Sequence, residues 1–359
     1  MQAICNVSLD AISKNYKFFQ KRISPAQVIP VVKANAYGHG AIAITKHLHA
    51  VCGVNLFAVA TLEEAQEISD ISPEISTLIF SRVFATELVE LPPNSILSIG
   101  SYEDAQTIVA SDHPEVKVHL NVNTGMNRLG LSPEQALELI SDPSTPLNIQ
   151  GVYSHFSSSD TLDDSTYKNQ NQIFGDFASK LRSIGYSGLI HFSNSAGVLH
   201  ENQPYYDGVR LGIGLYGFDT SPTGFFQDHL TPAMTVKAPL VRIERVKAGS
   251  TVSYGERWQT AEDTNIGTLR IGYADGYSRA LTNTGSTFYN GKQYPVVGTV
   301  TMDHIMINLG DDTPQTGSLV TVLGGDRESV KIASVAEKLN TITYEICCAI
   351  SPRVHREYT

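Results

Sequence analysis

The chain contains 359 residues, 42% of them hydrophobic, and carries a formal net charge of −10 at pH 7. This length suits two domains, each able to bury a core of its own. The acidic balance argues against nucleic acid or an anionic membrane surface as a main partner, since both select basic surfaces. Every apolar run is also shorter than the stretch of about 18 residues that a transmembrane helix needs.

The four cysteines, Cys5, Cys52, Cys347 and Cys348, show no C-x-x-C spacing and therefore do not suggest a zinc site. Free thiols are the simplest interpretation, and they fit a reducing compartment. The N-terminus lacks a cationic segment followed by an apolar one, which is the pattern of a secretory signal. We therefore expect a cytoplasmic protein that holds no metal.

Short apolar runs rich in β-branched residues recur through the first two-thirds of the chain, separated by segments with helical spacing. Thr61 with Glu64, and Ser101 with Asp104, have the spacing of helix N-terminal caps. Strands that alternate with helices in this way predict a (β/α)₈ barrel rather than an open doubly wound sheet. The predicted strands span residues 28–33, 55–60, 76–80, 96–100, 116–122, 149–155, 190–194 and 208–214.

The sequence changes character after about residue 230, where β-rich segments replace the alternation of strands and helices. Within them, Asn290-Gly291 is a strong signal for a two-residue hairpin turn. We therefore predict a (β/α)₈ barrel domain over residues 1–225, followed by a mostly β domain over residues 230–359.

Lys33 ends the first predicted strand and precedes a glycine-containing turn over residues 34–40. Burial of an amine at such a position disfavours its ammonium form and makes it a nucleophile. This is the chemistry of a lysine that forms a Schiff base. On spacing alone, a lysine that only improves solubility at a strand end is the alternative.

Polar residues also end several of the later strands. In (β/α)₈ barrels the carboxyl ends of the strands meet at one mouth, where active residues collect. The loops after the seventh and eighth strands frequently bind a phosphate through backbone amides, and glycine lets the chain approach such an anion closely. The alternative for Gly212 is that it only relieves crowding in the last strand. The residues expected at the mouth are Lys33, Asn121, Asn123, Arg128, His155, Asn194, Ser195, Arg210, Gly212 and Ile213.

Several sequence blocks carry a resemblance that covers nearly the whole chain, from about residue 4 to about residue 356. They are VVKANAYGHG at 31–40, MNRLG at 126–130, YSHF at 153–156, SNSAG at 193–197, GVRLGIGLYG at 208–217, VSYG at 252–255, IGYADGY at 271–277 and TMDHIMI at 301–307. In content and order they resemble the alanine racemases, a family of fold-type III pyridoxal-phosphate enzymes. The resemblance implies racemisation of L-alanine to D-alanine, which supplies D-alanine for peptidoglycan.

The resemblance also implies roles for individual residues. Lys33 and Tyr254 are implied to be the two acid–base groups, one on each face of the substrate α-carbon. Tyr254 is implied to reach the site from the partner chain of a homodimer, so that each active site is composite. Pyridoxal 5′-phosphate is implied to be held by Lys33, Tyr37, Arg128, His155, Asn194, Ser195, Arg210, Gly212 and Ile213. Arg128, Met302 and Asp303 are implied to bind the small amino-acid substrate, and Asp160, Tyr273 and Arg279 to line the access corridor.

Arg210 separates the reaction types within this fold type. An arginine on an inward-facing strand needs hydrogen-bond acceptors, and a salt bridge with nearby Asp207 is the alternative interpretation. The resemblance places Arg210 against the pyridine nitrogen of the cofactor. Because an arginine does not give up its proton, that nitrogen stays unprotonated, and the ring is a weaker electron sink. This favours racemisation over transamination, and it argues against a decarboxylase.

The chain departs from the family pattern at two positions. Many relatives carry a carbamylated lysine where this chain has Asn121, and we expect an anion, chloride, between Asn121 and Arg128. Pro352 stands where some relatives place a tyrosine that lines the site, which favours a wider choice of small substrates. The alternatives are a serine or broad-specificity racemase, a non-catalytic pyridoxal-phosphate-binding protein, and a barrel without cofactor.

Overall fold

The computed structural model describes residues 2–111, 113, 115–142, 146–161, 165–200, 204–221 and 223–359. The chain forms two compact units, which we call the barrel unit and the β unit. The barrel unit comprises Ala11–Ala36 and Ala41–Thr231, and the β unit comprises Met1–Asp10, Tyr37–Gly40 and Pro232–Thr359. Within the described ranges, no helix is both long enough and apolar enough to cross a membrane.

The barrel unit contains an eight-stranded parallel sheet in the order β2-β9-β8-β7-β6-β5-β4-β3. A parallel bridge between Val31 and Ala58 joins the first strand to the second and closes the sheet into a barrel. The predicted (β/α)₈ architecture is therefore confirmed. The strands are β2 Gln27–Pro30, β3 Leu56–Val59, β4 Ser76–Ile79, β5 Ser95–Ile99, β6 Lys117–Asn121, β7 Asn148–Tyr153, β8 Leu189–His191 and β9 Gly208–Leu211.

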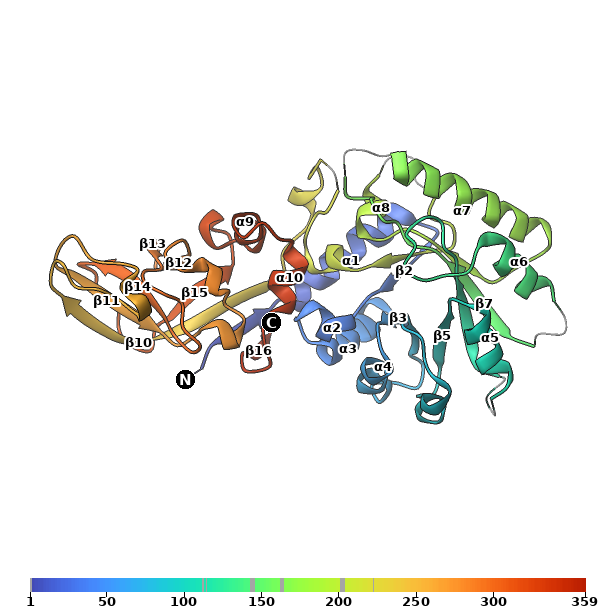
Figure 1. Ribbon diagram of the computed structural model, residues 1–359, viewed down its shortest axis with the longest axis horizontal. Helices are drawn as coiled ribbons and strands as arrows, with labels where there is room; N and C mark the ends of the chain where they lie inside the picture. The colour runs from blue at the N-terminus through green and yellow to red at the C-terminus, as the bar shows by residue number, and fades with distance from the viewer. Residues whose placement is uncertain are drawn as a thin grey trace. The chain divides into compact units, whose positions relative to one another are not determined.

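Helices lie outside the barrel strands, as Figure 1 shows. Strands covered in this way are buried on both faces, which explains why they read as continuous apolar runs. Thr61 and Glu64 form a complete capping box at the start of α4, as their spacing predicts. The helices are α1 Leu9–Ile23, α2 Lys33–Tyr37, α3 Ala41–Cys52, α4 Leu62–Ser69, α5 Tyr102–Val109, α6 Pro133–Ser141, α7 Ser165–Ser183 and α8 Ser195–Leu199.

The β unit is built on a second, mostly antiparallel sheet, in which the path β13-β12-β15-β10-β1-β16 is joined by β11 and β14. Asn290 and Gly291 both have positive φ and connect β12 to β13, so the predicted hairpin turn is confirmed. The elements are β1 Ile4–Val7, β10 Met234–Val246, β11 Thr264–Leu269, β12 Ser286–Tyr289, β13 Lys292–Pro295, β14 Ile305–Gly310, β15 Leu319–Gly324, α9 Ile332–Lys338, α10 Thr343–Cys348 and β16 His355–Tyr358.

The N-terminal strand belongs to this second sheet, although the sequence division assigned residues 1–225 to the barrel. Strand β1 pairs antiparallel with β10, with Ile4 opposite Lys237, and parallel with β16, with Ile4 opposite His355. A four-residue strand gives no sequence signal for which of two sheets it will join, because both offer apolar neighbours.

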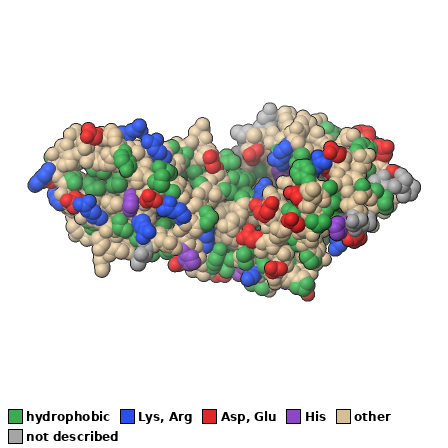
Figure 2. Space-filling view, turned by 60° about the horizontal axis from the view of Figure 1, so that its bottom comes forward, with side chains coloured by type: hydrophobic (Ala, Val, Ile, Leu, Met, Phe, Trp, Pro, Cys, Tyr) green, Lys and Arg blue, Asp and Glu red, His purple; other side chains and the backbone are tan. Residues whose placement is uncertain are grey.

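On the face shown in Figure 2, basic side chains are interspersed with acidic and apolar ones rather than gathered into one continuous stripe.

Candidate active site

Lys33 lies just beyond strand β2, at the carboxyl end of the barrel strands, and its side chain is partly buried. The short helix α2 that it begins is left-handed, because Ala34, Asn35 and Ala36 have φ of 51–53° and ψ of 49–51°. Left-handed helix costs an L-residue roughly 1–2 kcal/mol, and it is rare outside glycine. The sequence predicts a turn here but not its handedness. Strain of this kind points to a functional role for the segment.

Arg210, on strand β9, is fully buried, and neutral groups alone accept its described hydrogen bonds. One terminal nitrogen donates to His191 Nδ1 at 2.8 Å, and the other donates to His155 Nδ1 at 3.0 Å. Three backbone carbonyls at the ends of β7 and β8, those of Ser154, His191 and Phe192, accept the rest. The alternative salt bridge is absent, because Asp207 pairs instead with Arg182. Burial lowers the pKa of Arg210 to about 10, so the guanidinium still carries its charge at pH 7.

Three histidines lie around Arg210 and beyond it in the barrel: His119 and His191 are buried, and His155 is partly buried. A guanidinium only donates, so His155 and His191 must accept at Nδ1 and carry their proton on Nε2. His191 Nε2 lies 3.0 Å from Nδ1 of His119, which fixes the same tautomer there. Burial, reinforced by the charge of Arg210, lowers the pKa of His119 to about 3 and the pKa values of His155 and His191 well below their usual range. All three imidazoles are therefore neutral.

The segment after strand β9 presents backbone amides to the hydroxyl of a serine that follows strand β8. Asn194 caps helix α8, and its side-chain oxygen accepts the N–H of Gly197 at 2.8 Å. The backbone N–H groups of Gly212 and Gly214 donate to Ser195 Oγ at 3.0 and 3.2 Å. Ile213 begins the following 3₁₀ turn and is buried. The predicted phosphate-end residues therefore converge, with Gly212 packed against a polar partner.

Arg128 and Asn121 flank the same mouth. Asn121 is the last residue of β6 and is partly buried, whereas Arg128 lies in the following loop and is exposed. The charge of Arg128 contributes to lowering the pKa of His155, as does that of Lys33, so these three side chains share one electrostatic environment. Asp160 lies in the exposed segment after β7.

The remaining predicted site residues lie in the β unit. Tyr254 is 75% exposed on a turn in which Ser253, Gly255 and Glu256 all have positive φ, and its carbonyl oxygen accepts Thr299 Oγ1 at 2.7 Å. A tyrosine held out in this way by a strained turn contradicts the simple expectation that an aromatic residue in a β domain is buried.

Met302 and Asp303 form a loop that is tied to the turn holding Tyr273. The carbonyl oxygen of Met302 accepts the N–H of Ala274 at 3.1 Å, and Met302 is 51% exposed. Asp303 accepts Arg353 at 2.7 Å. Tyr273 and Arg279 are exposed, whereas Tyr37 is buried against the ring of Tyr344.

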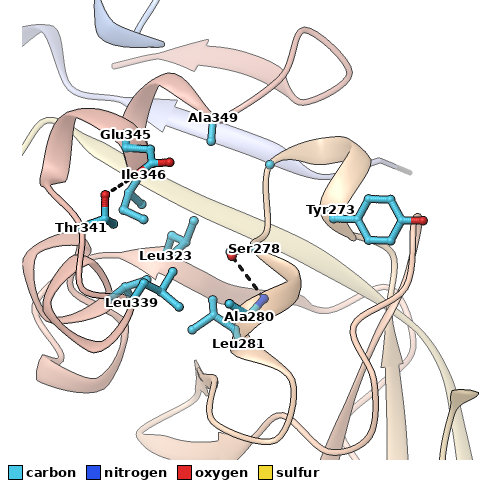
Figure 3. Close-up of a pocket in the computed structure, with 12 residues that line it drawn as sticks. Tyr273, Ser278, Ala280, Leu281, Leu323, Leu339, Thr341, Glu345, Ile346 and Ala349 are labelled. Atoms are coloured by element: carbon cyan, nitrogen blue, oxygen red, sulfur yellow. Dashed lines mark hydrogen bonds between the residues drawn. The ribbon is translucent and has the colours of Figure 1, made fainter. Parts of the chain in front are cut away.

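A pocket of about 330 Å³ in the β unit is shown in Figure 3. Its base is apolar, and Thr341 and Glu345 hydrogen-bond to each other at its rim. The ring of Tyr273 is directed away from the leucines of the base (Figure 3). The residues that line this pocket include no lysine, arginine or histidine, and none of them is a predicted cofactor-binding residue. We therefore do not assign it to the candidate site.

Comparison with known proteins places these features in a family. Residues 7–220 match the alanine racemase N-terminal domain, and residues 233–358 match the alanine racemase C-terminal domain. The chain belongs to the alanine racemase family. The family match thus spans both the barrel unit with Lys33 and Arg210 and the β unit with Tyr254.

Individual relatives of the family agree along their whole length. The alanine racemase of Methanococcus maripaludis is 36% identical over 370 residues, covering 98% of this chain and 97% of that protein. The crystal structure of alanine racemase from E. faecalis is 32% identical, with a TM-score of 0.91, and covers 99% of this chain and 98% of its own. A structure from Bartonella henselae, 29% identical with a TM-score of 0.87, covers 100% of both chains and contains covalently bound pyridoxal phosphate.

The residues of the barrel unit fit pyridoxal phosphate. A fully buried arginine without a described carboxylate partner leaves a cation that an anionic ligand can compensate. The amides of Gly212 and Gly214, together with Ser195, would hold the phosphate, and Arg210 would donate to the ring nitrogen. Lys33 would supply the amine that binds the aldehyde carbon.

Sequence reasoning missed His119 and His191. Both are buried, and each interrupts a run of buried apolar residues: His119 stands between Val118 and Leu120, and His191, which ends β8, stands between Ile190 and Phe192. That interruption is the signal that could have found them, because a buried polar side chain needs a partner. Sequence reasoning found Glu64 only as a helix cap, although its carboxylate also accepts the backbone N–H of Ala34 at 2.6 Å.

Proposed function

We propose that this protein interconverts L-alanine and D-alanine, with pyridoxal 5′-phosphate bound through Lys33. The observation that carries the proposal is Arg210, a buried cation at the barrel mouth whose described partners are all neutral. When bound, the cofactor makes the α-hydrogen of an amino acid acidic. A ring nitrogen that faces an arginine stays unprotonated, and this limits transamination and decarboxylation.

Two groups on opposite faces of the α-carbon exchange the proton in this proposal. Lys33 serves one face, and Tyr254 serves the other. The exposure of Tyr254 supports this role, because a phenol that projects from its own unit is available to a second chain. The strained turn around Gly255 holds it in that position. The proposed active form is therefore a homodimer whose two sites each combine residues from both chains.

The substrate end of the proposed site binds a small carboxylate. Arg128 pairs with the substrate carboxylate, and Met302 and Asp303 of the partner subunit close this end. Asn121 lacks the charge needed to hold Arg128, so a chloride ion between them takes that role. Asp160, Tyr273 and Arg279 line the access corridor, which their exposure supports. The D-alanine serves peptidoglycan, and the free cysteines fit the cytoplasm as the site of synthesis.

One set of assays tests the proposal. The purified protein should show the visible absorbance of a lysine-bound cofactor, and Lys33→Ala should abolish it. The wild-type protein should convert L-alanine to D-alanine, with loss of the α-hydrogen to solvent deuterium. Tyr254→Phe should slow removal of the proton from one enantiomer far more than from the other. Equal slowing of α-hydrogen exchange from L-alanine and from D-alanine would contradict the assignment of Tyr254 to a single face.

Serine is the alternative substrate in the same assay. The observation that favours it is Pro352, which is exposed and leaves out one hydroxyl that some relatives contribute. A kcat/KM for serine that equals or exceeds that for alanine would make the protein a serine or broad-specificity racemase. A cofactor-bound protein that turns over neither amino acid would leave the non-catalytic alternative.

A further inference from the structure

We propose that Glu64 is a positioning residue that holds the left-handed turn behind Lys33 and thereby keeps the lysine at the barrel mouth. The inference deepens the proposed function, because it rests on Lys33 being the cofactor lysine. Glu64 lies on helix α4, which follows the neighbouring strand β3. It touches neither cofactor nor substrate in this proposal.

The turn after Lys33 needs an external hold. Four consecutive residues, Ala34 to Tyr37, have the positive φ that L-residues disfavour, and none of them is glycine. Such a segment relaxes toward ordinary backbone angles unless the surroundings fix it. Because Lys33 directly precedes it, relaxation of this turn changes the direction in which the lysine side chain leaves the strand.

The carboxylate of Glu64 supplies that hold. Its Oε1 accepts the N–H of Ala34 at 2.6 Å, and its Oε2 accepts the N–H of Ala60 at 2.7 Å and that of Thr61 at 3.3 Å. One side chain thus ties the start of the turn to the end of strand β3. At the far end, the side-chain oxygen of Asn35 accepts the N–H of Ala41 at 2.8 Å. The turn is fixed at both ends by side-chain acceptors.

A carboxylate suits this position better than an amide does. All of its contacts are backbone donors, and an ionised carboxylate presents acceptors on both oxygens. A glutamine would turn one NH₂ group toward a backbone N–H and lose that bond. Glu63 provides a matched control, because it precedes Glu64 on the same helix and is exposed.

The test compares cofactor retention in Glu64→Gln and Glu63→Gln. During dialysis of the cofactor-bound protein, Glu64→Gln should lose visible absorbance about tenfold faster than wild type, whereas Glu63→Gln should match wild type within roughly twofold. In alanine racemisation, kcat should fall more than KM rises. Hydrogen exchange at the amide of Ala34 should accelerate about tenfold in Glu64→Gln.

Rescue by glycine separates positioning from general stability. Ala34→Gly added to Glu64→Gln should recover about fivefold in retention, because glycine adopts the left-handed conformation without strain. Ala43→Gly, in the right-handed helix α3, should give no recovery. Wild-type retention in Glu64→Gln, or equal effects of the two glycines, would overturn the inference. If wild type binds no cofactor, the proposed function fails, and exchange at Ala34 still tests the hold by Glu64.

Discussion

Lowering the pH from 7.5 to 5.5 should strongly destabilise this protein, because His119, His155 and His191 stay neutral in the folded state. Their folded pKa values are lowered from 6.5, so the unfolded chain binds more protons below that pH. Stability is therefore complete above pH 6.5 and falls as the pH falls toward the folded values, about 3 for His119. By pH 5.5 each histidine costs about 1.4 kcal/mol, and the three together about 4 kcal/mol.

Urea unfolding followed by far-UV circular dichroism at the two pH values measures this loss. His119→Asn removes one titrating ring, while the side-chain oxygen of the asparagine can still accept a hydrogen bond from His191. The unfolding free energy that this variant loses between pH 7.5 and 5.5 should therefore be only about 3 kcal/mol. Ser98→Ala is the control, because it removes the acceptor of the Tyr153 hydroxyl in the same barrel without removing a histidine. This variant should be less stable than wild type at both pH values, but should lose the same unfolding free energy as wild type between them. Equal stability at both pH values, or identical pH dependence in wild type and His119→Asn, would refute the neutral histidine chain.

Three further predictions concern other parts of the molecule. Arg210→Glu should reduce kcat for alanine on the order of a hundredfold. It should also raise the amount of pyruvate formed per racemisation turnover, which a coupled dehydrogenase measures. An unchanged ratio of pyruvate to D-alanine would contradict the proposed role of Arg210. Anomalous diffraction should show a chloride ion between Asn121 and Arg128, and finding only water at that position would contradict this prediction. Gly272→Ala should cost about 3 kcal/mol of unfolding free energy, because a Cβ would lie 2.3 Å from Met302 O. Gly175→Ala, whose Cβ would come no nearer than 3.8 Å to Tyr206 OH, should cost far less.

The barrel could be predicted because its local signals agree. Strand after strand is a short apolar run, and caps such as that formed by Thr61 mark the helices between them. Strand β1 could not be placed, since its pairing with β10 and β16 depends on residues more than two hundred positions away. Local pattern carries no information about which of two sheets a short strand will join.

The candidate site was predictable in its residues but not in its geometry. Polar residues at strand ends, such as Lys33 and Arg210, stand out because strand interiors are apolar. The left-handed turn at Ala34–Ala36 could not be recognised in the sequence, because no glycine marks it and because the contacts that stabilise it come from Glu64, which is distant in sequence. His119 and His191 were overlooked because a single histidine in a strand is commonly a satisfied core residue, and only the fold brings the two rings together.

The central claim is that Lys33 of one chain and Tyr254 of another act on the same substrate, and mixing two inactive variants tests it most directly. Lys33→Ala and Tyr254→Phe proteins are unfolded together, refolded as a mixture, and assayed for D-alanine formation. Composite sites predict that each mixed dimer regains one intact site, which restores activity to about a quarter of the wild-type level under random pairing. Sites built within single chains would leave every site lacking one residue, and a mixture as inactive as its components would contradict the account.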